Sequence, residues 1–163
     1  MKKLRLILLV VFCALLLPSA AYPQQSAPER KRTFKPIKRE PRVGDKISGY
    51  PKFTRLLMIG SSQTDPAYDV SYQGKNFTVT ANDKIISYIS TTDASFKTPE
   101  GIGVGDTLEK VLSLPQRKLI REPGWAFYVY LESGWRAAFT RGEYMTEEEL
   151  PPTAKVKWLF RRD

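Results

Sequence analysis

The chain has 163 residues, a formal net charge of +9, a single cysteine and no histidine. It therefore lacks the imidazole and almost all of the thiol ligands that dominate zinc, copper and iron sites. The usual general base of a nucleophilic triad is also missing. We predict no metal and no cofactor, and histidine-dependent hydrolysis is excluded.

The first 21 residues have the pattern of a cleavable secretory signal peptide. A short basic start precedes an unbroken apolar run over residues 6–17, and small side chains at Ser19 and Ala21 suit a cleavage site. This run is shorter than the roughly 20 apolar residues that a spanning helix needs. We predict export to the periplasm or the medium, cleavage before Tyr22, and no transmembrane helix in the mature protein.

Most of the excess positive charge lies before residue 45. Residues 22–44 hold seven Lys and Arg against two Glu, whereas residues 45–163 hold 16 Lys and Arg against 15 Asp and Glu. Four prolines and few apolar side chains predict that residues 22–44 are a flexible linker. The near-neutral remainder argues against nucleic-acid binding. Candidates for contact with anionic lipid or cell-wall polymer are Arg30, Lys31, Arg32, Lys35, Lys38 and Arg39.

From residue 45 onward, alternating apolar and polar side chains predict strands separated by turns. We expect an α+β domain over residues 45–163, in which one or two short helices pack against an antiparallel sheet. The predicted strands cover residues 68–72, 77–81, 85–91, 125–131, 135–140 and 155–161.

Two helices are considered. The first would begin with Asp106 as N-cap and Glu109 as its capping partner, and Pro115 would end it. The second would cover residues 51–59, with a strand over residues 55–59 as the alternative.

A short repeated segment suggests an internal duplication. Val-Gly-Asp at residues 43–45 returns at residues 104–106, and a search for such periods precedes any assignment of fold. The half-repeats would be residues 43–97 and 98–163, each a helical segment followed by three antiparallel strands. Chance similarity of a few turn residues is the competing interpretation.

Residues 98–111 read TPEGIGVGDTLEKV. This stretch resembles a T-x-x-G-I-x-x-G-D-S/T-x-x-x-V motif of uncharacterised bacterial envelope proteins. Over residues 43–163, the order of helix and strands is similar to the small modules of the BamE/SmpA lipoproteins and of the β-lactamase inhibitor proteins. The resemblance implies a protein-contact module rather than a catalyst.

Alternation along the strands predicts which side chains face the core, namely Phe127, Val129, Trp135, Phe139, Val156, Trp158 and Phe160. The opposite face would carry the candidate partner-binding residues Tyr72, Tyr88, Tyr128, Tyr130, Arg136, Lys157 and Arg161. Tyrosine and arginine are enriched at binding hot spots, although cross-strand pairing explains any one of them equally well. We therefore predict an exported, non-catalytic envelope protein that binds a protein or a surface.

The alternative function is hydrolysis of cell-wall or other extracellular polymer by paired carboxylates. The candidate carboxylates are Asp83, Asp93, Glu132, Glu147, Glu148 and Glu149. No spacing among them requires catalysis, so no catalytic residue is predicted.

Overall fold

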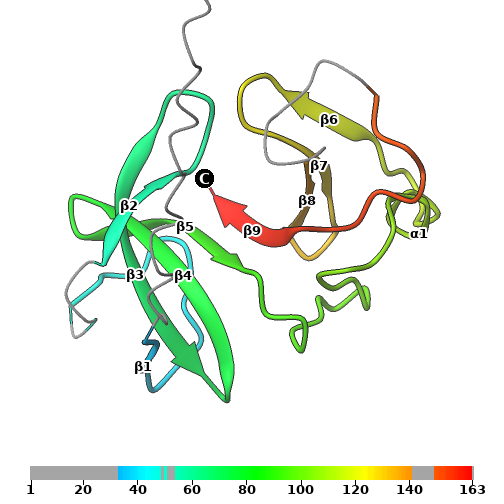
Figure 1. Ribbon diagram of the computed structural model, residues 1–163. Helices are drawn as coiled ribbons and strands as arrows, with labels where there is room; N and C mark the ends of the chain where they lie inside the picture. Colours follow the sequence, from blue (N-terminus) through cyan, green and yellow to red (C-terminus); the bar gives the residue numbers. More distant parts are fainter. Residues whose placement is uncertain (1–32, 49, 51–53, 141–148, 163) are drawn as a thin grey trace, which may run out of the picture. The chain divides into compact units, whose positions relative to one another are not determined.

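Nine strands form a single sheet in the computed structural model (Figure 1). The structure describes residues 33–48, 50, 54–140 and 149–162, which belong to one compact unit, residues 32–163. The predicted signal peptide and the cations at 30–32 lie outside these ranges. The strands are β1 (Lys35–Pro36), β2 (Arg55–Met58), β3 (Thr64–Tyr72), β4 (Lys75–Asn82), β5 (Ile85–Thr91), β6 (Leu119–Glu122), β7 (Ala126–Tyr130), β8 (Arg136–Phe139) and β9 (Trp158–Arg162).

The strand order is β1-β3-β4-β5-β9-β8-β7-β6, and β2 pairs with the same edge of β3 as β1 does. Pairing is antiparallel throughout except between β1 and β3. The fold is therefore mainly β, and the expected α+β class is wrong. Within the described residues the single helix is α1 (Leu108–Leu112), whose five residues are too few to form a layer on the sheet.

Both helix predictions need correction. The N-cap of α1 is Thr107, whose hydroxyl accepts a hydrogen bond from the Lys110 amide, while Asp106 accepts one from the Gly103 amide instead. The region expected to form a second helix contains β2, so the alternative strand is what forms; residues 51–53 lie outside the described ranges. Exposure alternates along β2, but apolar residues occupy exposed as well as half-buried positions. The sequence therefore fits the period of a helix as well as that of a strand.

Two hydrophobic clusters lie on opposite faces of the sheet. The larger cluster includes Val129, Ile89 and Leu159 and defines what we call the outer face. Connecting segments cover it with side chains such as Ile37 and Phe96. These segments have little regular structure. Loops therefore cover this face of the sheet, where helices were expected to pack.

The smaller cluster defines the inner face. Its centre is Phe160, whose ring lies 5.6 Å from that of Tyr88, 5.0 Å from that of Trp125 and 5.5 Å from that of Tyr128. Trp158 packs against the same cluster. The prediction that Trp158 and Phe160 share a face with Phe127 and Val129 is therefore wrong.

A β-bulge explains this error. The Lys157 amide donates to the carbonyl of Ala138, the residue that is paired with Trp158, so two residues of one strand oppose one residue of the next. Val156 before the bulge and Leu159 after it both reach the outer face. One extra residue reverses the side-chain alternation, and no feature of the local sequence announces it.

The strand order reads the same from both ends: β2-β3-β4-β5 meets β9-β8-β7-β6 at the β5–β9 pair. A bulge at Ser87 in β5 corresponds to the one at Lys157 just before β9, because Thr80 pairs with Tyr88 while Ala81 pairs with Ile86. Each half contains a meander of four strands where three were expected, and only the second half has a helix, α1, among its described residues.

The repeated Val-Gly-Asp segments occupy matching places in the two halves. The Gly44 amide donates to the Ile86 carbonyl at 2.8 Å, and the Gly105 amide donates to the Val156 carbonyl at 2.9 Å. Both glycines have φ near +90°, a region that favours glycine. These matches agree with the predicted duplication in their geometry. That the two halves descend from one ancestral segment stays a prediction.

The expected linker differs from the structure in its second half. Residues 35–36 form β1, the Ile37 amide donates to the Ser71 carbonyl, and Val43 packs against the outer cluster. These contacts hold the segment along one edge of the sheet. No helix in the described part of the chain is long and apolar enough to cross a membrane.

Arg162 joins the two ends of the curled sheet. Its guanidinium donates to the Ile59 carbonyl at 2.9 Å, next to β2, and forms an ion pair with Glu122 at the end of β6. The Glu122 carboxylate also accepts from the Ser61 amide, and the Trp125 indole donates to the Met58 carbonyl. We call this set of contacts the Arg162 clamp.

The clamp predicts a pH dependence of stability. Burial alone would raise the pKa of Glu122, but the hydrogen bonds from Arg162 and Ser61 outweigh it and hold that pKa below its usual value. The carboxylate therefore stabilises the fold above its unfolded pKa of about 4.3, and this contribution is lost as the pH falls through the folded pKa. In urea unfolding we expect Glu122→Gln to be less stable than wild type at pH 7 and equal to it near pH 2. The exposed Glu132→Gln should match wild type throughout, and a pH-independent loss in Glu122→Gln would contradict the clamp.

The bulge predicts which of two nearby residues supports the core, Lys157 just before β9 or Leu159 within it. Leu159→Ala should lower the free energy of unfolding by about 2–5 kcal/mol, the range for buried Leu→Ala changes, because Leu159 is fully buried. Lys157→Ala, at an exposed position, should change it by less than about 0.5 kcal/mol. Chemical denaturation measures both, and a small loss for Leu159→Ala would place this side chain on the solvent side.

Candidate functional site

A cavity of about 300 Å³ opens on the inner face, between β2 on one side and aromatic residues of both halves on the other. Trp125, Trp158 and Tyr88 line its aromatic side, and Leu57 of β2 lines the opposite one. Phe34 also contributes to the wall. We call it the inner-face pocket.

The floor of the pocket is polar because three neighbouring strands place hydrophilic side chains at paired positions. Thr78 of β4 is paired with Asp69 of β3 and with Ser90 of β5. All three side chains are buried. A buried polar row of this kind is stable only when its members are hydrogen-bonded.

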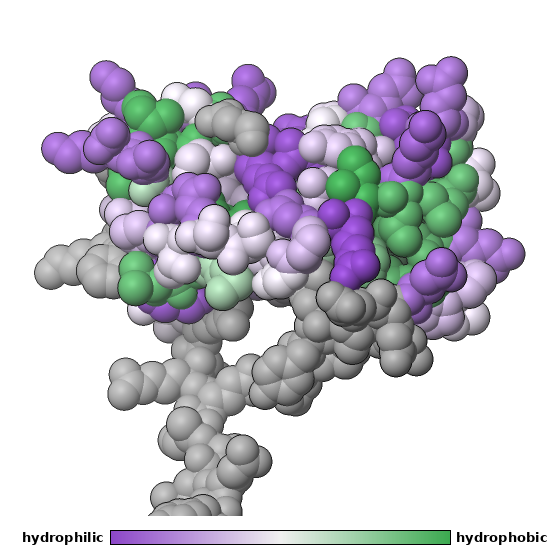
Figure 2. Space-filling model, turned by 90° about the horizontal axis from the view of Figure 1, so that it is seen from above, coloured by the Kyte–Doolittle hydropathy of each residue, from purple (hydrophilic) through white to green (hydrophobic). Residues whose placement is uncertain are grey.

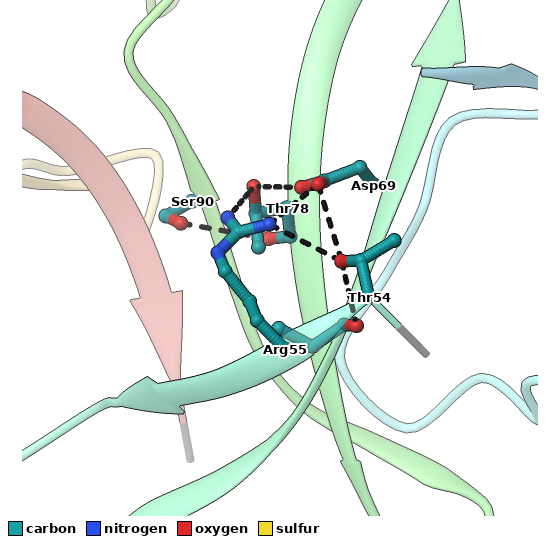
Figure 3. Close-up of polar contacts among 6 residues, drawn as sticks. Thr54, Arg55, Asp69, Thr78 and Ser90 are labelled. Carbon is teal, nitrogen blue, oxygen red and sulfur yellow. Dashed lines mark hydrogen bonds and ion pairs between the residues drawn. The ribbon is translucent and has the colours of Figure 1, made fainter. Parts of the chain in front are cut away.

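Asp69 organises this row (Figure 3). The Thr78 hydroxyl donates to one carboxylate oxygen at 2.8 Å, and Thr54 and Arg55 donate to the other at 3.2 and 2.5 Å. A second guanidinium nitrogen of Arg55 donates to the Thr78 hydroxyl. The Asp69 side chain is 2% exposed and that of Arg55 27%, so the carboxylate is closed off while the guanidinium borders the pocket.

The aromatic wall is held by its own contacts. Burial raises the pKa of Tyr88 well above its usual value, although hydrogen bonds with Ser90 and Trp158 oppose this shift. The rings of Trp125 and Trp158 meet edge to face at 5.8 Å, and the Arg162 guanidinium lies 4.8 Å from the Trp125 ring centre. The wall is therefore rigid, neutral and tied to the clamp.

The structure does not place the seven candidate partner-binding residues on one face. Tyr88 and Tyr128 lie inside the inner cluster and are nearly fully buried. Arg136 lies over the exposed ring of Tyr130, at 4.6 Å from its centre, on the same face. This pair is the accessible part of the predicted set on the inner face.

The remaining candidates lie elsewhere. Tyr72 packs against the outer cluster, and Arg161 stacks on Trp135 of that cluster at 4.7 Å. Lys157 is exposed at the bulge. Among the predicted anion contacts, Lys35 and Lys38 are exposed, and Arg39 pairs with Asp45 at 3.1 Å.

The candidate catalytic carboxylates that the structure describes lie on separate segments. Asp83 lies in the β4–β5 turn, and Glu132 lies in the β7–β8 turn with an exposed side chain. Asp93 follows β5. The hydrogen bond from the Ser95 side chain lowers the pKa of this carboxyl most, the Asn76 amide lowers it further, and burial opposes both. Glu147 and Glu148 lie outside the described residues. Within the described ranges, no three Asp, Glu or Cys side chains lie together as they would to hold a metal ion.

Of the candidate partner-binding residues, Tyr88 lines the inner-face pocket, whereas the residues of its polar floor were not predicted. A signal was present, because polar residues recur on β3, β4 and β5 at the positions of Asp69, Thr78 and Ser90. Such residues are usually read as solvent-facing. Only the pairing of the strands shows that they form one buried row.

A second hollow, of about 640 Å³, lies beside α1 and is lined mainly by apolar side chains, including Leu112, Leu119 and Leu150. In Figure 2 hydrophobic residues gather on the right of the face seen from above, the side on which Figure 1 draws α1. This hollow lacks the polar framework of the inner-face pocket.

Comparison with protein-family models finds no match, and none is found among curated proteins. A similar solved structure is the crystal structure of the uncharacterized protein yfeY from Escherichia coli. The two chains are 19% identical, the alignment covers 67% of this chain and 82% of that chain, and the TM-score is 0.44. The comparison assigns neither a family nor a function, and the resemblance to BamE/SmpA-like modules stays a prediction.

The polar floor predicts a specific pattern of stability changes. Asp69→Asn should cost about 3 kcal/mol, the lower end for a broken buried ion pair, because Arg55 keeps some access to water. The double change Arg55→Met with Asp69→Asn should recover part of this loss, because no charge then lacks a partner. Asp65 lies near the start of β3, and its carboxylate accepts a hydrogen bond from Gln63. Asp65→Asn should therefore cost less than about 0.5 kcal/mol. Additive losses in the double variant, measured by denaturation, would contradict the coupling.

Proposed function

We propose that the chain is an exported, non-catalytic binding protein and that the inner-face pocket is its binding site. The observation that carries this proposal is a preformed cavity with an aromatic wall and an arginine fixed at its floor. Ligand sites in proteins typically combine largely apolar walls with a few oriented polar groups. The export part of the proposal rests on the signal-peptide pattern of residues 1–21.

The polar floor supports ligand binding more than it supports stability. Removing Arg55 and Asp69 from water costs free energy that their attraction recovers only with good geometry, and an apolar pair of similar volume often serves the fold equally well. The two threonines bonded to Asp69 supply that geometry. The result is a guanidinium held in one orientation at the edge of a cavity, which is what recognition of a ligand requires.

The chemistry around the pocket favours binding over catalysis. A general acid or base must be able to exchange a proton with a bound substrate. Asp69 is enclosed by three donors, and the pKa of Glu122 is held low by Arg162 and Ser61 despite burial. The chain has no histidine. The groups near the pocket are therefore suited to orient a ligand rather than to transform it.

Leu57 and Leu56 allow a matched test, because they are neighbours on β2 with different surroundings. Leu57 lines the pocket and packs against the inner cluster, whereas Leu56 is 64% exposed. Leu57→Trp places a large ring in the cavity, while Leu56→Trp adds the same ring in solvent. Only the first change should block a ligand.

Native mass spectrometry of the chain recovered from its native envelope reads both parts of the proposal. We expect the mass of a chain that begins at Tyr22. Wild type and Leu56→Trp should also carry a bound ligand, and Leu57→Trp should carry none. Equal adducts in all three proteins, or none in any, would refute the pocket as the binding site. A mass that includes residues 1–21 would refute cleavage.

A further inference from the structure

We infer that the inner-face pocket takes an uncharged, polyhydroxylated ring, the chemistry of a neutral sugar unit of a glycan. This inference rests on the proposed function and names its ligand class. It follows from the aromatic wall, the balance of charge, the available hydrogen-bonding groups and the size of the cavity.

The aromatic wall suits a ring with a C–H face. Trp158 meets Trp125 edge to face, and it lines the pocket as a half-buried side chain. The face of an aromatic ring is electron-rich and attracts partially positive hydrogens. The axial C–H groups of a sugar ring provide such hydrogens over an area of matching size.

The charge balance selects against anions. Among the described residues that line the pocket, Arg55 is the sole charged side chain, and Asp69 lies directly behind it in an ion pair. An anionic ligand would have to compete with a carboxylate that is held by three donors. It would also approach that buried charge, where repulsion is weakly screened. A neutral ligand avoids this cost.

The hydrogen-bonding groups select against a purely apolar ligand. Asn76 and Thr92 line the pocket, and their side chains make no hydrogen bond to other described residues. An amide and a hydroxyl together offer donors and acceptors. An acyl chain would remove these groups from water without replacing their hydrogen bonds, which costs free energy. Sugar hydroxyls both donate and accept, so they can satisfy both groups.

The size of the cavity limits the ligand. A volume of about 300 Å³ lies at the lower end of ligand pockets, whose usual range is about 300–1,000 Å³. One or two sugar rings fit such a space, and a longer glycan would extend past the rim.

The ligand class is tested by tryptophan fluorescence, because Trp125 and Trp158 line the cavity. The mature chain, residues 22–163, is titrated with three neutral disaccharides (cellobiose, maltose and N,N′-diacetylchitobiose), with glucuronate, and with decanoate. We expect at least one neutral disaccharide to give a saturable change. Leu57→Trp should weaken the binding of that disaccharide at least about tenfold. Binding to this variant is measured by calorimetry, because the added tryptophan would change the fluorescence signal. Leu56→Trp should stay within about twofold of wild type.

Salt provides a second readout. Binding of a neutral ring to a charge-balanced pocket should change less than about twofold between low and high sodium chloride, because there is little net charge to screen. Tighter binding of glucuronate or decanoate than of every disaccharide would overturn the inference, as would a steep dependence on salt.

The two proposals can fail separately. If no disaccharide binds but the native mass adduct persists in wild type and is lost in Leu57→Trp, the sugar inference is wrong and the binding function stands. If neither the titrations nor the native mass detects a ligand, both are wrong.

Discussion

The arrangement of this sheet depends on the contacts of the Arg162 guanidinium. It links the carbonyl of Ile59 beside β2 with the carboxylate of Glu122 on β6, two segments at opposite ends of the strand order. An open sheet with two free ends would leave its inner face in water. The clamp instead brings Met58 within reach of the Trp125 indole, and the inner-face pocket exists because these ends meet.

The two halves share a scaffold but differ in what they place on the inner face. Ser90 of β5 is paired with Phe160 of β9, the corresponding position of the other half. Around Ser90 lie a threonine and the Asp69–Arg55 pair, whereas Phe160 is surrounded by aromatic rings and by Arg136. The first half therefore supplies the polar floor and Tyr88 of the aromatic wall, and the second half supplies Trp125 and Trp158. A pocket of mixed character results because a nearly symmetric scaffold carries unlike side chains.

Much of the strand pattern was predictable. The segment expected at residues 85–91 is β5 with the same bounds, and the segments expected at 125–131 and 135–140 contain β7 and β8. The edge strands were harder, since Leu56 and Met58 of β2 are apolar yet exposed and fit a helical period. The pocket could not be predicted, because Asp69, Thr78 and Ser90 become one buried row only when three strands pair in a particular register.

Local chemistry was sufficient to specify the strands away from the sheet edges and the two Val-Gly-Asp corners, since alternation and positive φ at glycine act over a few residues. It could not specify which face each strand presents. The bulges at Ser87 in β5 and at Lys157 just before β9 reverse the alternation, and the need for them arises from strands that are distant along the chain. Register and closure are decided by the packing of both faces at once, which is why the outer core, the clamp and the inner-face pocket emerge only in the folded protein.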